Sequence, residues 1–512
     1  MALEDWFARS EALRGAPWLR ALTVSRDEWR QAAQDIVAGG GRLVTLWASR
    51  DERAVTRIRA TFLAERRGLV LSLPIADPDT PYPGLEDLFP VAARLQRAVA
   101  DLSGLHSTAA DTRPWLRHAA WPQSYRPLID PPSLESAAEP ALDAYEFVRV
   151  EGDGVHEIAV GPVHAGTIEP GHFRFSVVGE KVLRLEEHLG YVHKGIEQRF
   201  TQLPILEAHR LAARVSGDSA VAFSWAYCQA LEGISGTEIP PRAVWLRALY
   251  LELERVANHL GDLGALGNDA GFAFGLMQFS RLKEHLLRTN QEALGERYLM
   301  DAIVPGGTRQ DLTPPILPSL RRCVLEIERQ VRTLRVIYDE HEGVRDRFNG
   351  AGTVTADLAA RLGLTGLAGR ASSQAFDLRI DMPCEPYGEF SVTKIVRSEG
   401  DVAARVAVRF DELQESCRLI QHILGALPVG PHHTPVRVPA DGAVGVGLIE
   451  GWRGPVWISL EAGPNGTIRR CHPHDPSWQN WPVLEHAIIG NIVPDFPLIN
   501  KSFNLSYSGH DL

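Results

Sequence analysis

The sequence predicts an α+β fold: a small N-terminal α/β domain, then a large domain in which a short β-rich segment leads into a long-helix bundle. Two observations predict it. Helix-like and strand-like segments alternate within residues 1–107, and three long amphipathic stripes follow residue 240. Between them, residues 108–140 are rich in Pro, Ala, Ser and Asp, as linkers are. The second predicted domain is therefore 141–512.

One helix and two strands are expected in the N-terminal domain. Residues Trp29–Val37 have a helical pattern, which the glycines at 39–41 end. Residues Arg42–Trp47 and Gly68–Leu73 are apolar runs of strand length. Together these segments are typical of a small α/β unit.

The large domain is expected to begin with strands at Tyr145–Val150, Val155–Val160 and Phe173–Val178. Three helices then carry apolar residues at spacings of three and four. One begins near Pro241, a residue favoured in the first helical turn, and the others span 320–338 and 406–427. Such stripes predict a bundle whose core lies between them.

Composition narrows the class of partner. The 64 acidic and 53 basic residues give a net charge of −11 with no basic stripe, which argues against nucleic acid. The first residues are acidic where a signal peptide is basic, and no apolar run approaches the ~20 residues of a membrane span. We therefore expect a cytoplasmic chain with no direct membrane span. The five cysteines form no CxxC pair, so no local zinc or iron–sulfur motif is present.

Several short motifs follow one another in a specific order. They are Gly161-Pro162-Val163-His164, Glu169-Pro170-Gly171-His172-Phe173-Arg174, Gly190-Tyr191-Val192-His193-Lys194-Gly195-Ile196-Glu197, Asn258-His259-Leu260, Arg370-Ala371-Ser372-Ser373 and Asn480-Trp481-Pro482. This succession resembles the large subunit of energy-converting, formate-hydrogenlyase-type nickel–iron hydrogenases and, in varied form, the quinone-site large subunit of respiratory complex I. The N-terminal part, through Phe89-Pro90 and Asp101–Leu105, resembles the small complex-I subunit often fused to it.

The resemblance implies four metal-binding cysteines, and this chain has none of them. The hydrogenase patterns R-x-C-G-x-C and D-P-C-x-x-C fall on residues 214–219 and 504–509, so the cysteine positions hold Ser216, Ser219, Ser506 and Gly509. Low-valent nickel and iron need soft thiolates, and a serine hydroxyl is a hard donor that stays protonated near neutral pH. We therefore predict a relict cavity at these positions and at Gly217, with no metal.

Complex I resembles this chain in having lost the same metal centre, and its cavity is a quinone headgroup site with a tyrosine and a histidine. The tyrosine position falls at Gly217 and the histidine position near Glu169. Neither group is kept, which puts ordinary quinone reduction in doubt. A quinone stays one candidate ligand, and the alternative is a collapsed, hydrogen-bonded remnant.

Glu169 and His172 are candidates for a proton path. Glu169 stands where these families place an ionisable residue that passes protons, and a buried glutamate with a raised pKa can do so. The alternative is a surface carboxylate. His172, like His164, either extends the path or hydrogen-bonds within its loop.

Asp218 and Arg453 are the other candidate cavity residues. Asp218 either titrates in the cavity or pairs with Arg214. Arg453 stands where the resemblance places an arginine over the metals, and the alternative is a structural bridge between carboxylates. Residues 475–477, Asp-Pro-Ser, are predicted to form a turn.

The resemblance implies a soluble-side subunit of a membrane-bound redox complex that couples electron transfer to ion translocation without a nickel–iron centre. It implies a small iron–sulfur subunit and antiporter-like membrane subunits as partners, with the iron–sulfur clusters in the partner. The subunit would lie on the inner face of the membrane. Two rivals remain: a subunit of the NADH–quinone oxidoreductase type that binds a quinone, and a scaffold without chemistry of its own.

Overall fold

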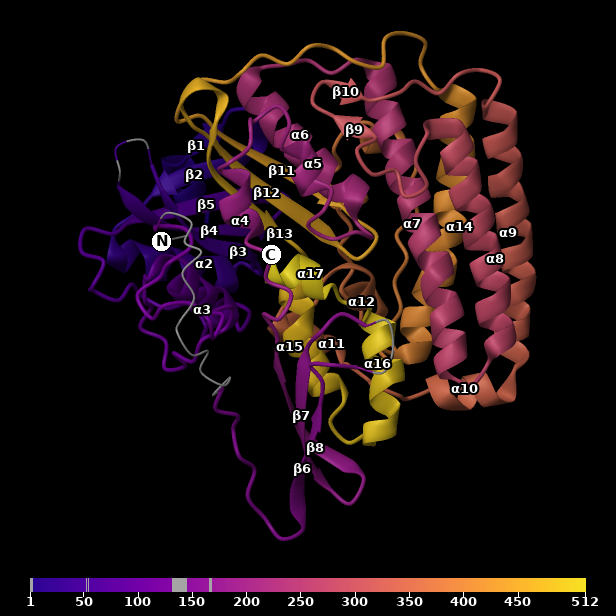
Figure 1. Ribbon diagram of the computed structural model, residues 1–512, viewed down its shortest axis with the longest axis horizontal. Coiled ribbons are helices and arrows are strands. Elements are labelled where there is room, and N and C mark those ends of the chain that lie inside the picture. The colour runs from indigo at the N-terminus through magenta and orange to yellow at the C-terminus, as the bar shows by residue number, and fades with distance from the viewer. Residues whose placement is uncertain (1–2, 52, 54, 131–144, 165–167) are drawn as a thin grey trace.

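The computed structural model describes residues 3–51, 53, 55–130, 145–164 and 168–512. It has an α+β fold, as predicted. The N-terminal region lies to one side of a central sheet, and a bundle of long helices lies on the other (Figure 1). In the described part of the chain, no helix is both long and apolar enough to cross a membrane.

The N-terminal region is built on a five-stranded sheet in the order β1-β2-β5-β4-β3, in which β2 and β5 run parallel. Its elements are α1 (Leu3–Arg9), β1 (Glu11–Leu13), β2 (Ala16–Thr23), α2 (Arg26–Ala38), β3 (Arg42–Arg50), β4 (Thr56–Ala64), β5 (Arg67–Pro74) and α3 (Ala92–Ser103). Ser25 and Glu28 form a capping box at the start of α2, and the helix ends at Gly39. The predicted helix and both predicted strands are confirmed.

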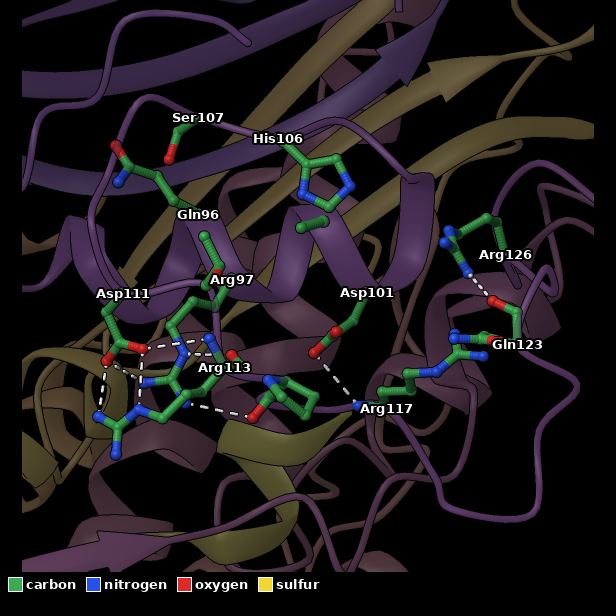
Figure 2. Close-up of a pocket in the computed structure, with 13 residues that line it drawn as sticks. Gln96, Arg97, Asp101, His106, Ser107, Asp111, Arg113, Arg117, Gln123 and Arg126 are labelled. Atoms are coloured by element: carbon green, nitrogen blue, oxygen red, sulfur yellow. Dashed lines mark hydrogen bonds and ion pairs between the residues drawn. The ribbon is translucent and has the colours of Figure 1, made fainter. Parts of the chain in front are cut away.

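Residues 108–130, the described part of the predicted linker, pack against α3. Figure 2 shows the side-chain cluster that holds them, around a cavity of about 260 Å³. Asp111 binds both Arg97, at 3.2 Å, and Arg113, at 2.7 Å. Asp101 of α3 accepts the backbone N–H groups of Trp115 and Leu116, and the Trp115 side chain is buried. These charged groups therefore hold residues 108–130 against α3, although their composition suggests a linker. Residues 131–140 of the predicted linker lie outside the described ranges.

A three-stranded antiparallel sheet follows, with β6 (Val155–Val160), β7 (His172–Val178) and β8 (Lys181–His188) in that order. Two of its strands were predicted. The prediction of a strand at 145–150 was wrong, because that segment has no strand structure. Its aromatic side chains serve packing instead: the Tyr145 ring stacks on His188 at 4.1 Å, and the Tyr145 hydroxyl accepts a hydrogen bond from Arg97.

Four long helices form the bundle: α7 (Pro241–Asp269), α8 (Ala273–Leu294), α9 (Leu317–Glu340) and α14 (Val402–Ala426) (Figure 1). Three of them match the three predicted stripes. The fourth, α8, was not predicted. Its buried residues Phe279, Leu282, Leu286 and Ala293 nevertheless recur at helical spacing, so the stripe is present in the sequence; the exposed Met277 and Phe274 lie outside it.

Buried ion pairs join the bundle to the segments around it. Arg370 contacts Glu412 of α14 at 2.7 Å and Glu450 at 2.9 Å, and its side chain is wholly buried. Arg379 pairs with Asp377 at 2.7 Å. Because a buried charge is stable only when it is paired, these residues fix the connections between elements.

The central sheet contains β11 (Val444–Glu450), β12 (Pro455–Ala462) and β13 (Ile468–His474), all antiparallel, with α6 (Ala220–Ser235) packed across it. It was not predicted from the sequence. The remaining elements are α4 (Ile196–Phe200), α5 (His209–Ala212), β9 (Ile303–Val304), β10 (Gly307–Thr308), α10 (Glu342–Phe348), α11 (Ala356–Leu362), α12 (Gly366–Ala371), α13 (Leu378–Asp381), η1 (Tyr387–Glu389), η2 (Pro464–Gly466), α15 (Ser477–Ala487), η3 (Val493–Asp495), α16 (Phe496–Phe503) and α17 (Tyr507–Asp511).

A polar seam joins the N-terminal sheet to the central sheet, where β3 meets β13. The His472 ring stacks on Trp47 at 5.1 Å and contacts the Thr45 hydroxyl at 2.8 Å. Its other nitrogen lies 2.7 Å from Glu197, and Arg470 donates to the carbonyl oxygen of residue 48. These groups are buried, so the two sheets are held together by matched hydrogen bonds as well as by packing.

Candidate functional site: a relict cavity

Three of the five predicted cavity positions, Ser216, Gly217 and Ser506, line one cavity, while Ser219 and Gly509 lie beside it. A cavity of about 280 Å³ is lined by residues 168–169, by residues 216–218 before α6, by Arg453 after β11, and by residues 501 and 504–508 of the C-terminal segment. It is therefore formed by the segments that precede α6, that follow β11, and that contain α16 and the start of α17. We call it the relict cavity.

The hydroxyl groups that stand in cysteine positions bond to one another. The Ser216 Oγ lies 2.8 Å from the Ser506 Oγ and 2.8 Å from the Asp218 Oδ1. The Ser506 Oγ also accepts the backbone N–H of Gly509 at 2.8 Å, which caps α17. Ser219 donates to the same Asp218 oxygen at 3.3 Å. The three serines thus form one network with Asp218.

Arg453 completes this network through an ion pair with two hydrogen bonds. Its Nη2 lies 2.6 Å from the Asp218 Oδ2, and its Nη1 donates to the Oδ1 at 3.2 Å. Burial alone would raise the pKa of Asp218, but the guanidinium and the two hydroxyls hold it below its usual value. The alternative prediction, that Asp218 pairs with Arg214, is wrong, because Arg214 pairs with Asp301 at 2.6 Å.

A second carboxylate, Asp475, belongs to this site and was missed from the sequence. It is fully buried where β13 gives way to α15. Its Oδ1 accepts the backbone N–H of Ser477 at 2.8 Å, while its Oδ2 has no hydrogen-bond partner among the described residues. Burial raises the pKa of Asp475. An aspartate before a proline indicates a turn, and nothing in the sequence signals its burial.

Asp475 occupies the space beside Gly509. A Cβ atom added at Gly509 would lie 2.6 Å from the Asp475 Oδ2 and 3.0 Å from the Ser506 Oγ. Gly217, the tyrosine position of complex I, differs, because an added Cβ there would have no atom within 4 Å. One relict position is therefore filled by a carboxylate and another is open.

The structure separates the two proton-path candidates. Glu169 lines the cavity and accepts the Ser508 backbone N–H at 3.3 Å, and burial raises its pKa. His172 does not line the cavity: its Nδ1 lies 3.1 Å from the Gly161 carbonyl oxygen, and its ring packs on Phe147. His164 contacts the carbonyl oxygen of residue 171 at 3.1 Å. Both histidines make contacts within their loops.

The residues present do not fit a nickel–iron centre. Three of the four ligand positions hold hydroxyls that are already engaged in hydrogen bonds, and the fourth holds a glycine backed by Asp475. Hard oxygen donors do not replace the four thiolates that such a centre needs. Among the residues that the structure describes, no group of three or more His, Cys, Asp or Glu side chains could hold a metal ion.

Comparisons with known proteins show the family to which this chain belongs. Residues 269–443 match the family described as "Respiratory-chain NADH dehydrogenase, 49 Kd subunit". Formate hydrogenlyase subunit 5 of Escherichia coli is 31% identical over 436 residues, which cover 84% of this chain and 77% of that protein. The chain belongs to this family of hydrogenase and complex-I large subunits. The resemblance predicted from the motifs is thereby confirmed.

Two further relatives extend the comparison. Hydrogenase-4 component G of Escherichia coli is 30% identical over 455 residues, covering 88% of this chain and 79% of that protein. A solved chain from a membrane-bound sulfane sulfur reductase, an archaeal respiratory membrane complex, is 25% identical with a TM-score of 0.66. It matches 70% of this chain and 99% of its own length.

Proposed function

We propose that the chain is a peripheral subunit of a membrane-bound redox complex that couples electron transfer to ion translocation, and that it holds no nickel–iron centre. Membership of the family supports the assignment to a membrane-bound redox complex. The observation that carries the lack of a nickel–iron centre is the relict cavity, in which Ser216 bonds to Ser506, and Ser216 and Ser219 both donate to the Asp218 carboxylate that pairs with Arg453. Hydroxyls engaged in this way are hard donors that do not replace the thiolates a nickel–iron centre needs.

The proposed partners are a small iron–sulfur subunit docked at the relict cavity and antiporter-like membrane subunits. The complex would hold this chain on the cytoplasmic face of the membrane. An exposed apolar side chain at the cavity supports docking there: Ile168, which lines the cavity, is 46% exposed. Electrons would then enter and leave through the partner.

Purification of the intact complex through a tag on this chain tests the proposal. We expect co-purification of an iron–sulfur protein and of integral membrane proteins, identified by mass spectrometry, with iron but no nickel by elemental analysis. Stoichiometric nickel, or dihydrogen evolution by the complex, would contradict the proposal. A chain that purifies alone from solubilised membranes would contradict the membership of a complex.

A second candidate function is quinone binding in the relict cavity. Two observations favour it: the space beside Gly217 is open, and Glu169 at the cavity carries a carboxyl whose pKa is raised, as a proton donor requires. Quinone turnover by the complex should then fall in Glu169→Gln and stay unchanged in Glu180→Gln, an exposed carboxylate on the β7–β8 turn. Equal turnover in both variants would refute this assignment.

The scaffold alternative makes the opposite prediction. If the subunit only transmits movement or holds its partners, complexes with Ser216→Ala, Ser219→Ala and Asp218→Ala should assemble and keep full activity. Loss of activity in an assembled complex would exclude a purely structural role. Subunit composition, measured on the same preparations, separates failure of assembly from failure of chemistry.

A further inference from the structure

A separate pocket of about 220 Å³ lies between α7 and α8. Leu253, Ala257 and Asn258 line it from α7, and Lys283 and Leu287 line it from α8. These residues follow one another at helical spacing, so each helix turns one stripe toward the pocket. The α7–α8 pocket meets the relict cavity at residues 217–218, but its walls are otherwise distinct.

One end of the pocket offers an unsatisfied acceptor. Asn290 of α8 is 1% exposed, and its amide nitrogen donates to the Arg297 carbonyl oxygen at 3.1 Å. Its Oδ1 has no hydrogen-bond partner among the described residues. Since buried polar atoms are almost always bonded, this oxygen indicates a missing O–H or N–H group.

The other end offers a cation. Lys283 precedes Asn290 by two helical turns, which places the two Cα atoms about 10 Å apart along α8. Its ammonium group lies over Gly261 of α7, where an added Cβ would be only 2.8 Å from the Nζ. No carboxylate of the described chain forms an ion pair with it, whereas the neighbouring Arg297 is paired with Glu284 at 2.5 Å. The Lys283 charge is therefore available to a ligand.

The space between the two ends is apolar. Leu287 lies between Lys283 and Asn290 on α8, and Leu253, Ala257 and Leu299 face it. The carboxyl group of Glu254 also reaches the wall, where it accepts the backbone N–H groups of residues 221 and 222. Burial raises its pKa to about 8, so at neutral pH Glu254 adds little negative charge to the wall. The Asp218 carboxylate, which also lines the pocket, is paired with Arg453 at 2.6 Å.

We propose that the α7–α8 pocket binds a small amphipathic molecule with a single ring, an anionic group at one end and a hydroxyl or N–H group at the other. The anion pairs with Lys283, the donor satisfies the Asn290 Oδ1, and the ring packs on Leu287 and Ala257. This inference goes beyond the proposed function, because binding here depends neither on the partners nor on the relict cavity.

The test uses 4-hydroxybenzoate as the probe, with the full-length chain in its purified complex. Calorimetric titration should show saturable binding, with benzoate and phenol each binding about tenfold more weakly because each lacks one polar contact. Lys283→Met should weaken 4-hydroxybenzoate about tenfold and leave phenol unchanged. The control, Lys181→Met on β8, is exposed and distant and should bind as the wild type does.

Asn290→Leu should remove the preference for 4-hydroxybenzoate over benzoate, provided that its thermal unfolding matches that of the wild type. Because Lys283 is only half-buried, Lys283→Met remains informative if Asn290→Leu fails to fold. Absence of binding at millimolar probe, or equal affinities in wild type and Lys283→Met, would overturn the proposal. Both outcomes leave the composition of the complex, and so the proposed function, untouched.

Discussion

Gly509→Ala tests whether Asp475 has closed the fourth cysteine position. The added Cβ would sit 2.6 Å from the Asp475 Oδ2, well inside ordinary contact distance, and Asp475 is fully buried and held by Ser477. Overpacking of this kind costs about 1–3 kcal/mol. Gly509 also lies in α17, where alanine is favoured over glycine by about 1 kcal/mol. The single variant therefore mixes two opposing effects.

A double-mutant cycle with Asp475→Ala separates them. The helix-propensity gain at position 509 and the 3.0 Å contact with the Ser506 Oγ are the same in both backgrounds, whereas the 2.6 Å clash exists only when the Asp475 carboxylate is present. We expect Gly509→Ala to be about 1–3 kcal/mol less costly in the Asp475→Ala background than in the wild type. Differential scanning calorimetry measures this coupling; for 512 residues unfolding as one unit it corresponds to roughly 1–3 °C.

Gly217→Ala is the matched control, because an added Cβ there meets no atom within 4 Å. It should change stability equally in both backgrounds. If Gly509→Ala costs the same with and without Asp475, the carboxylate does not fill that position and the reasoning is wrong. The result also bears on metal binding, since a cysteine at 509 needs the same space.

Three further predictions concern buried charges. Arg453→Met should destabilise the protein by about 1–3 kcal/mol, less than for a fully buried pair because the Asp218 side chain is 37% exposed. This loss should shrink below about pH 4, because a carboxylate with a lowered pKa stabilises only while ionised; thermal melts against pH measure it. Glu254→Gln should gain stability relative to the wild type as the pH rises from about 5 to about 8, because in that range the unfolded wild-type carboxyl is ionised while the folded one still holds its proton; the gain should level off above about pH 8. Arg370→Met should cost about 3–5 kcal/mol, because the buried Glu412 and Glu450 lose this cation and Glu412 keeps only its contact with His259 at 3.2 Å; calorimetry again measures it.

Elements with a clear period could be predicted. The helices α2, α7, α9 and α14 and the strands β3 and β5 follow from apolar spacing alone. The strands of the central sheet could not, because both faces are buried and the alternation that marks a half-exposed strand is absent. Helix α8 was missed although it has the same kind of stripe as the other long helices, since Phe279, Leu282, Leu286 and Ala293 are buried at spacings of three, four and seven.

The site was predictable as far as motifs reach. The family motifs predict that the four cysteine positions lie close together, and hence that a cavity forms there; these positions are Ser216, Ser219, Ser506 and Gly509. The partners that decide its chemistry did not follow from the sequence: Arg453 rather than Arg214 neutralises Asp218, and Asp475 fills the space beside Gly509. Both contacts join residues more than 30 positions apart, which local patterns do not report.

The polar seam between β3 and β13 has a mechanical consequence. Strand β13 ends at His474, so the residue that follows the seam along the chain is Asp475, which lies beside Gly509. Displacement of the N-terminal sheet would pull on His472 through Trp47 and Thr45 and reach that carboxylate within three residues. A force that a neighbouring protein exerts on the N-terminal sheet would therefore reach Asp475, beside the relict cavity, through strand β13 and not through the helices.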